Sequence, residues 1–85
     1  MNRLHYEIVK LEIDKWDPMG LLSIGAPDDE YDPEIKNIVN EIQAVKNENE
    51  LALLTKSIFE KWFGEEFDFE DCFKVAMNIW SKIEN

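Results

Sequence analysis

The stretch that decides the fold is residues 32–64, DPEIKNIVNEIQAVKNENELALLTKSIFEKWFG, which contains two amphipathic helical patterns. The first pattern runs to about Lys46 and has its apolar face at Ile35, Ile38, Val39, Ile42 and Val45. The polar residues Asn47, Glu48 and Asn49 break it, and the second face follows at Leu51, Leu54, Ile58, Phe59, Trp62 and Phe63. Because the connecting turn is short, we predict two antiparallel neighbouring helices.

Both ends of this stretch carry helix boundary signals. Asp32 precedes Pro33, so we expect the Asp32 side chain to cap the helix while Pro33 occupies its first position. Gly64 follows the second pattern and suits the left-handed residue just beyond a helix end.

A further amphipathic pattern lies on each side of this stretch. Tyr6, Val9, Ile13 and Trp16 share one helical face, which Leu4, Ile8 and Leu11 widen. Alternation over residues 9–14 leaves a short strand as the other interpretation, although such a strand would lack a pairing partner. At the other end we expect Asp68 to cap a helix with apolar positions at Phe69, Cys72, Phe73, Ala76, Met77, Trp80 and Ile83.

The segment between residues 17 and 32 is irregular, because it holds Pro18, Gly20, Gly25 and Pro27. Its apolar residues indicate that it packs against the domain, and a single helical turn at Leu21 and Leu22 stays open. The sequence therefore predicts one all-α domain over residues 1–85, a small three- or four-helix bundle with a long packed loop after the first helix.

Composition narrows the possible partners. Nineteen acidic and nine basic residues give a net charge of −10, which repels phosphate backbones and anionic lipid, so we expect neither nucleic acid nor a membrane as partner. Much of the negative charge lies in two clusters, at residues 14–34 and 60–71, that would attract a basic protein. The alternative is that the charge only maintains solubility.

Cysteine usage and the N-terminus predict a cytoplasmic protein. Cys72 is the only cysteine, which excludes an intramolecular disulfide and a multi-cysteine zinc site and fits a reducing compartment. Charged residues interrupt the apolar residues near the N-terminus, so no signal peptide or membrane helix is expected.

No residue pattern predicts catalysis, a metal or a cofactor. A calcium loop beginning at Asp28 would place Pro33 where glycine is needed and Val39 where the bidentate glutamate belongs. Gly20 and Gly25 have phosphate-loop spacing, but no Lys-Ser or Lys-Thr pair follows them. We expect His5 at the surface, and Cys72 and the three tryptophans in the core, although an exposed tryptophan would indicate a binding hot spot.

Residues 16–35, WDPMGLLSIGAPDDEYDPEI, resemble the signature of the YugE-like family of small bacterial proteins of unknown function. The later IFEKWFG is similar to the family pattern at lower specificity. The resemblance implies a compact helical fold and a cytoplasmic setting, and it implies no activity.

These observations favour a non-enzymatic interaction module that presents an acidic surface to a basic protein partner. The predicted surface consists of Asp28, Asp29, Glu30, Tyr31 and Asp32, extended by Glu65 and Glu66. One version is an immunity-type protein that neutralises a basic protein by fast electrostatic association. Two alternatives remain: a small ligand-binding protein or enzyme with a pocket under the 17–32 loop, and a homodimer that buries surplus aromatic area. The chain is thus expected to be a monomer or a homodimer.

Overall fold

The computed structural model describes residues 2–27 and 29–84, and it contains four α-helices. These are α1 (Arg3–Trp16), α2 (Asp32–Glu41), α3 (Glu48–Phe63) and α4 (Phe69–Glu84), with a short 3-10 turn over Ile42–Ala44 after α2. No strand occurs among the described residues. The all-α prediction is confirmed, and the first segment is a helix rather than a strand.

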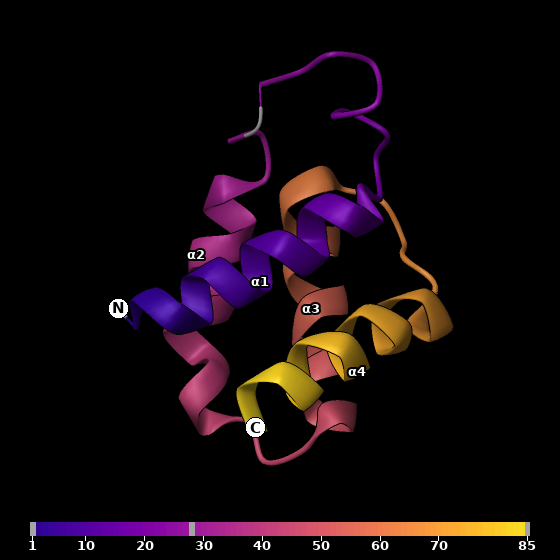
Figure 1. Ribbon diagram of the computed structural model, residues 1–85. Helices are drawn as coiled ribbons and strands as arrows, with labels where there is room; N and C mark the ends of the chain where they lie inside the picture. Colours follow the sequence, from indigo (N-terminus) through magenta and orange to yellow (C-terminus); the bar gives the residue numbers. More distant parts are fainter. Residues whose placement is uncertain (1, 28, 85) are drawn as a thin grey trace.

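The helices form two crossing layers (Figure 1). α1 and α4 lie side by side in front of α2 and α3, and the packing of α3 against α4 is the most extensive helix pair. The long connection after α1 rises beyond the bundle before the chain returns into α2. Residues 18–25 within it are turns and bends. The carbonyl groups of Leu21 and Leu22 accept from the N–H groups of Ala26 and Gly25 at 3.0 and 3.1 Å, so this segment forms a hydrogen-bonded turn and no regular helix.

One hydrophobic core lies between the layers. It receives side chains from every helix and from the residue that precedes α2: Val9, Ile13, Tyr31, Ile35, Ile38, Val39, Ile42, Leu51, Ala52, Ile58, Phe59, Val75, Ala76 and Ile79. Cys72 is fully buried as well, as predicted.

Some residues assigned to apolar faces are exposed. Leu4 and Leu11 expose 63% and 50% of their surface, because they lie on the side of α1 opposite Val9 and Ile13. Trp62 and Met77 are each half exposed, so the prediction of a core position is wrong for both. Trp16 and Trp80 are partly buried against the core.

Local hydrogen bonds explain where the helices begin and end. The Asn47 side chain accepts from the backbone N–H of Glu50, so α3 begins at Glu48, earlier than the apolar pattern indicates. Gly64 ends α3 in the left-handed region with φ 67°, as predicted. Asp68 accepts from the Asp71 N–H at 3.3 Å, which confirms its capping role.

The predicted capping role of Asp32 is wrong. Asp32 is the first helical residue of α2, Tyr31 occupies the cap position, and no side chain caps the helix. Instead, the Asp32 carboxylate accepts a hydrogen bond from the Tyr6 hydroxyl on α1 and pairs with Lys36 one turn later at 2.9 Å. Asp32 therefore links two helices rather than closing one.

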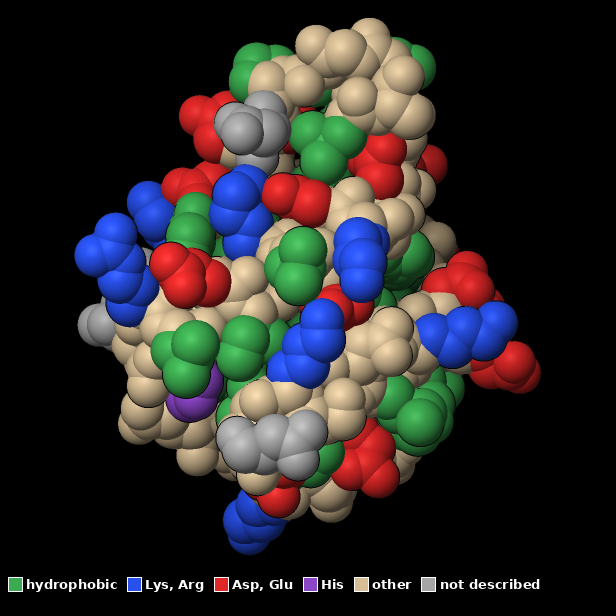
Figure 2. Space-filling model, in the orientation of Figure 1, with side chains coloured by type: hydrophobic (Ala, Val, Ile, Leu, Met, Phe, Trp, Pro, Cys, Tyr) green, Lys and Arg blue, Asp and Glu red, His purple; other side chains and the backbone are tan. Residues whose placement is uncertain are grey.

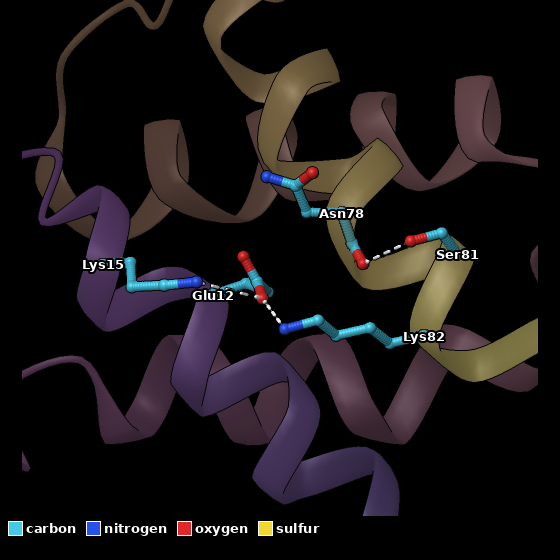
Figure 3. A network of polar contacts seen from close by, with 5 residues as sticks. All are labelled: Glu12, Lys15, Asn78, Ser81 and Lys82. Carbon is cyan, nitrogen blue, oxygen red and sulfur yellow. Dashed lines mark hydrogen bonds and ion pairs between the residues drawn. The ribbon is translucent and has the colours of Figure 1, made fainter. Parts of the chain in front are cut away.

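A second polar contact links α1 to α4 (Figure 3). Glu12 is 3% exposed, and its carboxylate lies 2.5 Å from the Lys82 ammonium in the last turn of α4. Lys15 approaches the same oxygen at 3.9 Å. The buried carboxylate thus has a partner from each side of the helix pair.

Candidate protein interface

The loop after α1 is organised by Asp17. This residue has φ 44°, a left-handed conformation that aspartate tolerates better than most side chains, and it ends α1. Its carboxylate accepts from the N–H groups of Leu22 and Ser23 at 3.1 and 3.0 Å, and from the Tyr31 hydroxyl at 2.5 Å. One side chain therefore ties both ends of the loop together.

Tyr31 fills the space between this loop and the bundle. It is fully buried, and its hydroxyl accepts from the Met19 N–H at 3.2 Å. Its ring lies 6.1 Å from Phe59 and 6.2 Å from Phe63. Tyr31 therefore lies in the space under the 17–32 loop, where the alternative interpretation places a ligand pocket.

The same aromatic cluster brings the two acidic segments to one end of the molecule. Phe63 at the end of α3 lies 6.4 Å from Phe67, and Trp16 at the end of α1 lies 6.1 Å from Phe67. The turn before α2 and the turn before α4 each contribute a ring to this cluster, Tyr31 and Phe67. We call the exposed carboxylates of these turns, Asp29, Glu30, Glu65 and Glu66, the acidic end.

Within residues 2–27 and 29–84, no ion pair neutralises the acidic end. The ion pairs found among the described residues use Glu7, Glu12, Asp14, Asp32 and Glu60 as their acids. None of them involves Asp29, Glu30, Glu65 or Glu66. These four carboxylates are exposed, so a basic surface would meet them without first breaking an ion pair between described residues.

The predicted site residues thus separate into two groups. Asp29, Glu30, Glu65 and Glu66 are exposed, whereas Tyr31 is buried and Asp32 is paired. Asp28 lies outside the described residues. Tyr31 and Asp32 instead make contacts within the fold, Tyr31 to Asp17 and Asp32 to Tyr6 and Lys36.

Hydrogen bonding explains the charge states of this region. The Tyr31 hydroxyl and the loop N–H groups lower the pKa of Asp17, and Tyr6 and Lys36 lower that of Asp32. Burial and Asp17 raise the pKa of Tyr31 to about 12, and the bond to Asp32, with burial, raises that of Tyr6 to about 12. Burial also raises the pKa of the Cys72 thiol to about 11, so this cysteine is protonated at neutral pH.

Trp62 is a surface residue that sequence reasoning missed. Its indole N–H lies 3.4 Å from the side-chain oxygen of Asn37 on α2, and the Asn37 amide donates to Glu41 at 2.7 Å. These two bonds orient a half-exposed indole in the last turn of α3, close to Glu65 and Glu66 in sequence. Periodicity places Trp62 on the apolar side of α3 but does not reveal that a polar side chain of α2 faces it.

Two further features are absent from the described residues. No group of three or more histidine, cysteine, aspartate or glutamate side chains is arranged there to hold a metal ion. No helix among them has the length and apolar character needed to cross a membrane.

Comparison with known proteins identifies the family and leaves the activity open. No curated protein and no solved structure matched the chain in these comparisons. Residues 7–82 match a domain of unknown function, DUF1871, which includes all of α2 and α3 and most of α1 and α4. The chain therefore belongs to the DUF1871 family.

Proposed function

We propose that this protein is a non-enzymatic interaction module whose acidic end binds a basic protein partner. The observation that supports this proposal best is the exposure of Asp29, Glu30, Glu65 and Glu66 without an ion pair among the described residues. Like charges held together in one fold raise its free energy, and an oppositely charged surface relieves that repulsion. Asp17, Tyr31 and the aromatic cluster fix the turns that carry these carboxylates. The turns therefore lose little conformational entropy when a partner binds.

Trp62 would supply the apolar anchor of such an interface. Tryptophan is enriched among interface residues with large binding energies, and a guanidinium or ammonium group stacks favourably on its ring. Because hydrogen bonding through Asn37 orients the indole, an arginine or lysine of the partner would meet a pre-arranged ring.

A more specific proposal concerns the cellular compartment of the protein and the class of interaction protein to which it belongs. The resemblance of residues 16–35 to the YugE-like family supports a bacterial, cytoplasmic protein. Small size, a charge of −10 and a helical fold suit an immunity-type protein that neutralises a basic protein, because electrostatic steering speeds its capture. This version rests on analogy of size, charge and fold class.

A homodimer is the second candidate, supported by a different surface. Leu4 and Leu11 are exposed seven residues apart on α1 and so lie on one stripe of the helix. Figure 2 shows apolar and basic side chains side by side on the face that α1 and α4 present. Sedimentation at several concentrations separates this candidate from the first, since Leu11→Gln would dissociate such a dimer and leave a monomer's behaviour unchanged.

The proposal is tested by affinity capture from native extract with charge-matched variants. Glu65→Lys with Glu66→Lys changes the net charge from −10 to −6, and so does the control Glu7→Lys with Glu84→Lys, which alters exposed acids outside the acidic end. We expect the wild type and the control to retain the same basic protein, and the acidic-end variant to lose it. Equal retention by all three proteins, or capture of proteins that are not basic, would contradict the proposal.

A further inference from the structure

A hollow between α1 and α4 lies apart from the acidic end's carboxylates and has a chemistry of its own. It has a volume of about 330 Å³ and is lined by Glu12, Lys15, Trp16, Asp71, Lys74, Val75 and Asn78. Its volume is at the lower end of the range for small-molecule sites, and it lies between two helices of a bundle, where such sites commonly occur.

The floor of the hollow is a fixed carboxylate. Glu12 is 3% exposed, and Lys82 holds it from α4 at 2.5 Å. Figure 3 shows the Lys15 and Asn78 side chains directed toward the space beside this carboxylate, one from each helix. Burying an ion pair costs desolvation free energy, so a buried pair often adds little to the stability of a fold. Its position beside a hollow is therefore consistent with a role in ligand binding.

The other charged side chains around the hollow form no close ion pair with described residues. Within residues 2–27 and 29–84, neither Asp71 nor Lys74 takes part in an ion pair, and Lys15 has only its 3.9 Å approach to Glu12. Asp71 and Lys74 are three residues apart on α4 and therefore neighbours on its surface. The lining thus offers two carboxylates and two ammonium groups beside the indole of Trp16 and the side chain of Val75.

We infer that this hollow binds a small zwitterion with an apolar side chain, of the α-amino-acid type. Lys15 and Lys74 would receive its carboxylate, Asp71 and Glu12 its ammonium group, and Trp16 with Val75 its apolar part. A zwitterion has no net charge, so the overall charge of −10 does not repel it as it would a simple anion. A simple cation would leave the two lysines without a partner.

The binding test uses phenylalanine and two blocked analogues, followed by amide and indole N–H chemical shifts. N-acetyl-phenylalanine keeps the carboxylate and loses the ammonium charge, whereas phenylalanine amide does the reverse. We expect phenylalanine to produce saturable shifts at Lys15, Trp16, Val75 and Asn78, and each analogue to bind at least tenfold more weakly, a difference of about 1.4 kcal/mol.

Variants identify the groups responsible. Asp71→Asn and Lys74→Gln should each weaken phenylalanine binding tenfold or more, whereas the controls Glu70→Gln and Lys61→Gln, at exposed positions outside the lining, should not. Circular dichroism verifies that each variant is folded. Absence of saturable shifts up to the solubility limit of phenylalanine, or equal binding of either analogue, would overturn the inference.

Discussion

At the scale of single residues, Glu34 is the most exceptional side chain. It is 4% exposed in the first turn of α2, and one of its carboxylate oxygens has no hydrogen-bond partner among the described residues. Burial, with the nearby charges of Glu30 and Asp32, raises its pKa above the usual 4.5. A raised pKa in the folded state means that Glu34 favours folding most below pH 4.5, and that this contribution disappears as the pH rises through the folded value.

Glu34→Gln should therefore stabilise the protein at neutral pH. The amide retains the shape of the side chain and removes the cost of burying a charge. Thermal melts between pH 3 and 8 should show little difference from wild type near pH 3. Near neutral pH, the variant should have the higher melting temperature. Glu70→Gln, at an exposed position on α4, serves as control. A lower melting temperature for Glu34→Gln at pH 7 would indicate that the ionised carboxylate has a partner.

Thr55 gives a second prediction at this scale. It is fully buried in α3, and its hydroxyl has no hydrogen-bond partner within the part of the chain that the structure describes. Thr55→Val replaces the hydroxyl with a methyl group of similar size and should raise the free energy of unfolding by about 1 kcal/mol. Thr55→Ser keeps the hydroxyl, loses a buried methyl group and should destabilise the protein by about 1 kcal/mol. Denaturant melts measure both, and destabilisation by Thr55→Val would show that the hydroxyl is satisfied in solution.

At the scale of helices and turns, Asp32 tests how α1 is attached to α2. If it bridges Tyr6 and Lys36, Tyr6→Phe and Asp32→Asn should show a coupling of about 0.5 to 3 kcal/mol in a double-mutant cycle. If Asp32 capped the helix, Asp32→Asn would lower the free energy of unfolding by the same amount with tyrosine or phenylalanine at position 6. Chemical denaturation of the four proteins distinguishes the two roles, and additive free energies would contradict the bridge.

The same elements show what the sequence could predict. Apolar periodicity identified each helix, and Gly64 and Asp68 marked the boundary between α3 and α4, because these signals depend on neighbours within one turn. The links from Tyr6 to Asp32 and from Glu12 to Lys82 join residues 26 and 70 positions apart, and nothing local encodes such pairs.

The candidate interface was predictable to a similar degree. The acidic segments were visible in the sequence, but the ring contacts that gather them at one end arise only in the folded molecule. Tyr31 and Asp32 belong to an acidic run by sequence and to the interior network by structure, because the turn before α2 directs them toward Asp17 and Tyr6.

At the scale of the whole molecule, two phenol-carboxylate pairs predict sensitivity to alkaline pH. The pKa values of Tyr6 and Tyr31 are raised from 10 to about 12, so each favours folding fully below pH 10 and loses that contribution as the pH rises toward 12. Unfolding by denaturant at pH 8, 10 and 11 should show a decline that is smaller in the double variant Tyr6→Phe with Tyr31→Phe. An equal decline in both proteins would contradict this assignment.

The central claim is that the acidic end supplies the rate of association with a basic partner. Exposed charges attract an approaching partner over a distance that salt limits, with a Debye length of about 10 Å at 0.1 M ionic strength. They therefore change the association rate more than they change the stability of the fold. The acidic-end variant and its charge-matched control therefore separate local steering from net charge.

The most direct measurement is the association rate with the captured basic protein, at low and high salt, by stopped-flow fluorescence. We predict that Glu65→Lys with Glu66→Lys slows association and removes most of its salt dependence, while melting at the wild-type temperature or above. The control Glu7→Lys with Glu84→Lys should associate close to the wild-type rate. An unaltered rate in the acidic-end variant, or equal slowing in the control, would contradict the claim.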